Sequence, residues 1–93
     1  MNRAYILVFN RNFDFDYNLL HKGIKDNPYI INWWHYLFSS YLLISPNNAK
    51  ELARSIRIFF PHKFLLMEIK SNNYYGWLSS EAWEWIKKYI GAP

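Results

Sequence analysis

The sequence predicts an α+β fold, and three observations carry this prediction. Apolar runs of strand length occur at residues 3–9, 29–44 and 63–70, and the middle run is long enough for two strands. Stretches with apolar residues at helical spacing separate and follow these runs. The order is therefore strand, helix, strand, strand, helix, strand, helix. This order is typical of the ferredoxin-like βαββαβ arrangement, so we expect a four-stranded antiparallel sheet with two helices on one face and an extra C-terminal helix.

The first strand and the first helix lie at the N-terminal end. Residues 3–9 read RAYILVF, a run rich in β-forming residues. Asp14 or Asp16 is suited to cap the following helix, because a short side-chain oxygen accepts hydrogen bonds from the free N–H groups of the first turn. Pro28 ends this helix, since proline disfavours a helical residue before it. The apolar stripe of the helix consists of Tyr17, Leu20 and Ile24.

The stretch of residues 31–45 predicts a central β-hairpin. It contains five aromatic rings and no Asp, Glu, Lys or Arg. A run this apolar in a protein with a net charge of +4 belongs inside a sheet. Residues 29–38 and 41–44 form the two strands, and the reversal falls at residues 38–40.

Alternation along the first hairpin strand gives it two apolar faces. Trp33 and His35 point to one face of the sheet, and Trp34 and Tyr36 point to the other. A strand that is apolar on both faces is covered on both faces. The cover on the second face is the C-terminal helix, a second subunit or a ligand.

The second half of the chain adds a helix and a strand. Asn48 and Glu51 have the spacing of a capping box, and Pro61 ends the helix that they begin. Residues 63–70, KFLLMEIK, form the fourth strand. Its two alternating sets are Leu65, Met67 and Ile69 on one side and Phe64, Leu66 and Glu68 on the other.

A loop and a last helix complete the chain. Residues 71–76 form a polar loop tipped by two tyrosines. Ser79 or Ser80 is suited to cap the last helix, and Gly91 ends it. The apolar stripe of this helix consists of Ala82, Trp85, Ile86 and Tyr89.

Length and composition limit the class of protein. Residues 1–93 are sufficient for one domain, and the absence of cysteine excludes disulfides and thiolate metal sites. We expect a cytoplasmic protein with no membrane partner, because no signal peptide and no membrane-length apolar run is present. Aromatic residues make up 22% of the chain, more rings than one small core easily hides. We therefore expect a homodimer.

Three pieces of the sequence together resemble a known family. They are the opening YILVF strand, the hairpin WWHYLFSSYLLIS and the closing GWLSSEAWEWI. They resemble the small bacterial proteins called SinR-like, which are similar to the CRISPR-associated protein of type two and to VapD-type toxin ribonucleases. The resemblance implies a ferredoxin-like dimer that acts on or near nucleic acid, with a role in defence, counter-defence or a toxin–antitoxin pair.

One position departs from the nuclease members of these families. Their first strand ends in an aspartate after an aromatic residue, whereas the matching position here is Asn10. A neutral amide is a poor ligand for a divalent metal, so the prediction leans away from an enzyme and names no catalytic residue. Asp14, Asp16 and His35 are the fallback catalytic candidates. No cofactor is predicted, and a divalent metal belongs only to the nuclease alternative.

The binding prediction rests on cations and exposed rings. Arginines neutralise phosphates and rings stack on bases. The predicted binding residues are Asn10, Arg11, Arg54, Arg57, Tyr74 and Tyr75. The predicted dimer contact uses one sheet face carrying Trp34, Tyr36 and Leu66, together with Trp77.

These residues predict a dimeric, non-catalytic protein that binds nucleic acid or a nucleotide. Two alternatives remain open at this point. One is a metal-dependent endoribonuclease of toxin type. The other is a protein-binding inhibitor or antitoxin, since buried rings and arginines are frequent at protein interfaces.

Overall fold

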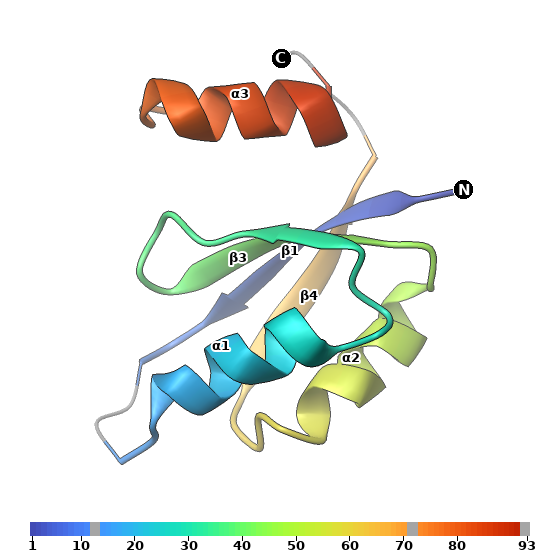
Figure 1. The fold of residues 1–93 in the computed structure, drawn as a ribbon, viewed down its shortest axis with the longest axis vertical. Helices are drawn as coiled ribbons and strands as arrows, with labels where there is room; N and C mark the ends of the chain where they lie inside the picture. The colour runs from blue at the N-terminus through green and yellow to red at the C-terminus, as the bar shows by residue number, and fades with distance from the viewer. Residues whose placement is uncertain (12–13, 71–72, 92–93) are drawn as a thin grey trace.

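The computed structural model describes residues 1–11, 14–70 and 73–91. Its elements follow the predicted order, and the α+β fold is confirmed (Figure 1). They are β1 (Arg3–Phe9), α1 (Tyr17–Asp26), β2 (Asn32–Trp34), β3 (Ser40–Ser45), α2 (Ala49–Arg57), β4 (Phe64–Ile69) and α3 (Ser80–Tyr89). The four strands form one antiparallel sheet in the order β2-β3-β1-β4.

The helices lie in two layers on opposite sides of the sheet. Helices α1 and α2 cover one face, and α3 lies on the other (Figure 1). The main core lies between the sheet and the α1–α2 layer. Its fully buried side chains include Tyr5 and Leu7 of β1, Leu43 of β3, Leu20 and Ile24 of α1, and Leu52 and Ile56 of α2. None of the helices in the described ranges is long and apolar enough to cross a bilayer.

The predicted helix caps are confirmed. Asp16 accepts a hydrogen bond from the backbone N–H of Asn18 at the start of α1. Asn48 and Glu51 form the complete capping box of α2. Ser79 accepts from the backbone N–H of Ala82 at the start of α3. Each cap satisfies donors that the first turn of a helix leaves without a backbone partner.

The hairpin is less regular than the sequence predicts. Strand β2 covers only residues 32–34 and lies at the edge of the sheet, so β1 and β3 are the central strands. After Trp34 the chain leaves the ladder. The ring of His35 contacts the backbone oxygen of Ser40 at 2.9 Å, and the Ser40 N–H donates to the oxygen of Leu37 at 3.3 Å. These bonds close a loop instead of extending the strand.

Leu66 was assigned to the wrong face of the sheet. It lies opposite Leu7 in the ladder and packs against the core beneath α1 and α2. Trp34 instead lies on the side of α3, where it stacks on Trp85. Alternation separates the two faces within one strand, but it does not show which face of β4 matches which face of β2.

Candidate functional site

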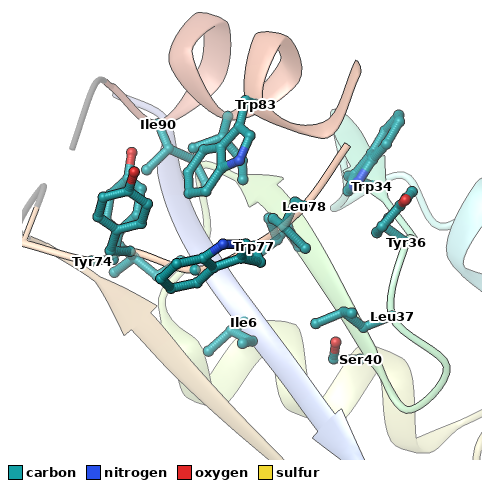
Figure 2. Close-up of a pocket in the computed structure, with 15 residues that line it drawn as sticks. Ile6, Trp34, Tyr36, Leu37, Ser40, Tyr74, Trp77, Leu78, Trp83 and Ile90 are labelled. Carbon is teal, nitrogen blue, oxygen red and sulfur yellow. The ribbon is translucent and has the colours of Figure 1, made fainter. Parts of the chain in front are cut away.

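The predicted site residues fall in two separate places. Asn10, Arg11 and His35 lie at the end of the hairpin, beside the start of α1. Tyr74, Tyr75, Trp34, Tyr36 and Trp77 lie on the other side of the sheet, around a pocket beside α3 (Figure 2). The predicted binding and interface residues therefore do not form a single site.

The first place is organised around Arg11. Its Nε donates to the backbone oxygen of Phe38 at 2.8 Å. Its guanidinium carbon lies 3.8 Å from the ring centre of Phe38 and 4.4 Å from that of Tyr17. Within the described residues no carboxylate forms an ion pair with Arg11. The cation is thus positioned by rings and one carbonyl, and none of the carboxylates in the described ranges pairs with it.

Two histidines and a tyrosine form a chain of contacts that begins at this arginine. The Nη2 of Arg11 lies 3.4 Å from Nε2 of His35, and the His35 ring stacks on Tyr41 with centres 4.0 Å apart. The Tyr41 hydroxyl is 2.9 Å from Nδ1 of His21, whose ring centre lies 6.3 Å from that of His35. We call Arg11, His21, His35 and Tyr41 the arginine–histidine cluster.

Burial and neighbouring charges set the protonation of this cluster. Burial lowers the pKa of His21, and the nearby His35 and Lys25 lower it further. Burial raises the pKa of Tyr41 to about 12, against a smaller opposing effect of Arg11. At neutral pH, His21 is therefore an uncharged imidazole and Tyr41 an uncharged phenol.

The lowered pKa of His21 predicts a loss of stability in acid. An unfolded histidine has a pKa near 6.5, so the unfolded chain takes up this proton first as the pH falls. The free energy of unfolding is then expected to decrease from about pH 7.5 down to the lowered pKa and to become independent of this group below it. Urea unfolding at several pH values measures the effect. The His21→Gln variant should lose this part of the pH dependence, whereas His62→Gln should keep it.

The other predicted cations lie on α2. Arg54 and Arg57 are exposed, and Arg57 donates to the backbone oxygen of His62 at 3.0 Å. The ring of His62 lies 4.7 Å from that of Phe15. Phe15 in turn contacts Tyr17, one of the two rings that flank Arg11. Arg57 therefore lies at the same end of the molecule as Arg11. Arg54 lies about one helical turn before Arg57 in α2.

The second place is an apolar pocket of about 410 Å³ between the sheet and α3. Figure 2 shows Trp83 of α3 above it and Trp77 across its mouth. Rings of Trp34, Tyr36, Tyr74 and Tyr75 complete its wall, and no Lys, Arg, Asp or Glu lines it. The pocket therefore offers apolar contact and nothing to neutralise a charged ligand.

The rings around this pocket pack on one another. Tyr36 stacks on Trp34, Tyr75 stacks on Trp77, and Tyr74 stacks on Trp83. The Tyr74 hydroxyl donates to the backbone oxygen of Gly91 and so ties the segment before α3 to the end of that helix. Residues 71 and 72 of the predicted polar loop lie outside the described residues.

The sequence signals missed two residues of the cluster and one of the pocket. Neither His21 nor Tyr41 was predicted as a site residue. Their proximity depends on how α1 crosses the sheet. Trp83 was left off the apolar stripe of α3, although it faces the pocket (Figure 2).

The fallback catalytic residues do not form a metal site with the arginine–histidine cluster. Asp16 caps α1. Among the described residues no three side chains of His, Asp or Glu come together in a way that could hold a metal ion. The comparisons with known proteins found no matching family model, no matching curated protein and no matching solved structure.

Proposed function

We propose that this protein binds single-stranded nucleic acid at the end of the sheet that carries Arg11. The observation that supports the proposal most is the Arg11 guanidinium on the face of Phe38, a ring that is 70% exposed. An arginine beside an exposed ring provides the two contacts that single strands use, phosphate pairing and base stacking. The proposal keeps the predicted cytoplasmic, SinR-like character, with Arg11, Arg54 and Arg57 as the phosphate contacts.

Binding through these three arginines predicts a defined salt dependence. Each phosphate contact on a single strand releases counterions, with a slope of about −0.7 per contact. Three contacts therefore predict an affinity about 20-fold weaker at 200 mM than at 50 mM salt. Fluorescence anisotropy with a short single-stranded oligonucleotide measures this change. An affinity that does not vary with salt contradicts the proposal.

Arg11 is expected to matter more than cations elsewhere on the surface. Arg11→Gln should weaken binding by about 10- to 150-fold, because a charge-assisted contact contributes roughly 1.5–3 kcal/mol. Lys87→Gln is the matched control. It changes the net charge equally, but Lys87 lies in the last turn of α3, in the opposite layer. Equal losses in both variants would show that binding follows net charge alone.

The dimer is part of the proposal, with a corrected contact surface. Val8, Leu65 and Met67 are all roughly half-exposed, and the pleat places them on the side of α3, opposite the buried Leu7. Trp77 lies on the same side of the sheet and is 93% exposed. We call Val8, Leu65 and Met67 the open sheet patch.

A second copy of the chain is the occupant that this patch favours. Strand β4 is an edge strand, so its outer backbone groups have no strand partner in the described sheet. Antiparallel pairing of β4 with another β4 satisfies those groups. A two-fold axis then relates the two copies, and the two open sheet patches lie side by side on one face of a continuous sheet.

Met67→Glu tests this dimer. In the β4–β4 pair the Met67 side chains of both copies project from the same face of adjacent strands, where like charges are destabilising, so the variant is expected to sediment as a monomer at micromolar concentration where the parent protein is a dimer. Leu19→Glu is the control, since Leu19 and Met67 are each 54% exposed but Leu19 lies on α1 in the other layer. A monomeric parent protein would contradict the proposal.

A further inference from the structure

We propose that the arginine–histidine cluster cleaves RNA without a metal ion, with His21 as general base and His35 as general acid. This inference rests on the proposed nucleic-acid binding and deepens it, because it names RNA rather than DNA as the substrate. Two imidazoles with ring centres 6.3 Å apart lie beside a cation that no described carboxylate neutralises. This combination of groups can move two protons and stabilise a phosphate.

The hydrogen bonds assign the working nitrogen of each ring. Nδ1 of His35 lies 2.9 Å from the backbone oxygen of Ser40, so this nitrogen carries a proton and donates it. Nδ1 of His21 lies 2.9 Å from the Tyr41 hydroxyl oxygen, and in the tautomer that the proposal requires this nitrogen carries the ring proton and donates it to that oxygen. Nε2 of His21 is then the bare nitrogen that can accept a proton, whereas Nε2 of His35 faces Nη2 of Arg11 at 3.4 Å. Tyr41 is buried, stacks on His35 and contacts His21, so one side chain positions both imidazoles.

Charge distinguishes the base from the acid. His21 faces Lys25 on its own helix and His35 and Tyr41 across the cluster, and its lowered pKa leaves Nε2 free to accept a proton at neutral pH. Nε2 of His35 lies beside Arg11. A phosphate bound between these two groups accepts hydrogen bonds from Arg11 and from the N–H at Nε2 of His35.

The reaction balances without any further reactant. The 2′-hydroxyl gives its proton to Nε2 of His21, and the 2′-oxygen forms a bond to phosphorus. The bond from phosphorus to the 5′-oxygen breaks, and that oxygen takes the proton from Nε2 of His35. The products are a 2′,3′-cyclic phosphate and a free 5′-hydroxyl. Arg11 stabilises the charge that develops on the phosphoryl oxygens.

The test compares an RNA oligonucleotide with its 2′-O-methyl analogue in the presence of EDTA. The RNA is expected to be cut to a 2′,3′-cyclic phosphate, and the analogue is expected to bind without being cut. His21→Gln and His35→Gln should each lower the cleavage rate by about 100-fold. His62→Gln, purified in parallel, should cleave at the parent rate and excludes a contaminating nuclease.

A structural role for the histidines is excluded by two further measurements. Each variant is required to bind the 2′-O-methyl analogue within threefold of the parent protein and to keep its circular dichroism spectrum. Lys25→Gln removes a cation that lowers the pKa of His21, so the acid limb of the pH–rate profile should move to higher pH. This shift is not expected from a general loss of folding.

The possible failures are distinguishable. If the analogue binds but RNA remains intact in EDTA, the cleavage inference is wrong and the binding proposal stands. If the analogue does not bind, the proposed function itself is wrong. Cleavage that persists unchanged in both histidine variants also overturns the assignment.

Discussion

Replacing Phe60 with alanine is expected to lower the free energy of unfolding by about 3–5 kcal/mol. Phe60 is fully buried where the end of α2 meets the sheet. Its ring lies 5.5 Å from Phe9 of β1 and 5.2 Å from Phe15, and both pairs have the edge-to-face geometry that adds to simple burial. Truncation removes these contacts and leaves a cavity that the surrounding rings cannot fill without moving.

Urea unfolding followed by tryptophan fluorescence measures this loss. A typical domain has only about 5–15 kcal/mol of stability, so the variant is expected to be marginally folded. Phe38→Ala is the control, because Phe38 is exposed and its removal should cost less than about 1 kcal/mol. A loss below 1 kcal/mol for Phe60→Ala would show that the aromatic cluster is not the centre of stability.

The fold was predictable because its signals are local. Helix caps at Asp16, Asn48 and Ser79 depend on residues two or three positions apart, and all three are confirmed. The apolar stripe of α1 likewise depends on spacing within one helix. The order of elements then limits the topology to a few arrangements.

The hairpin shows where local signals stop. A run of apolar residues indicates strand, but it does not show where pairing ends. Strand β2 pairs over three residues because the ring of His35 and the turn at Ser40 redirect the chain. The face of Leu66 was missed for a related reason. The register between strands that are distant in sequence is set by packing, which a period of two does not reveal.

The candidate site was only partly predictable. Arg11 and His35 were named from the sequence, whereas His21 and Tyr41 were not grouped with them. His21 follows Arg11 by ten positions and belongs to another element, so only the crossing of α1 over the sheet brings it to Tyr41. The separation of Tyr74 and Tyr75 from the arginines has the same origin, since they lie on the opposite side of the sheet.

Gly23 is a second case in which packing changes the meaning of a residue. From the sequence it is a weak point in α1, because glycine in a helix interior costs about 1 kcal/mol relative to alanine. In the structure a Cβ at this position would clash with Cγ and Cδ2 of the Phe59 ring. Glycine therefore permits the close approach of Phe59, just beyond α2, to the backbone of α1.

Gly23→Ala is accordingly expected to destabilise the protein by about 1–2 kcal/mol. The steric cost of overpacking is roughly 1–3 kcal/mol, and the helix preference of alanine offsets part of it. The sign should reverse in the Phe59→Ala background, where the ring is absent and alanine at position 23 should raise the free energy of unfolding by about 0.5–1 kcal/mol. Urea unfolding of the four proteins gives the coupling energy between the two sites.

This cycle separates two physical causes that a single variant confuses. If Gly23→Ala stabilises the parent protein as well, the Phe59 ring moves aside freely and helix preference dominates at this position. If it destabilises both backgrounds equally, the backbone of α1 at Gly23 requires glycine for a reason other than Phe59. Only a change in the sign of the Gly23→Ala effect between the two backgrounds shows that the absence of a side chain at position 23 sets the distance between α1 and the Phe59 ring.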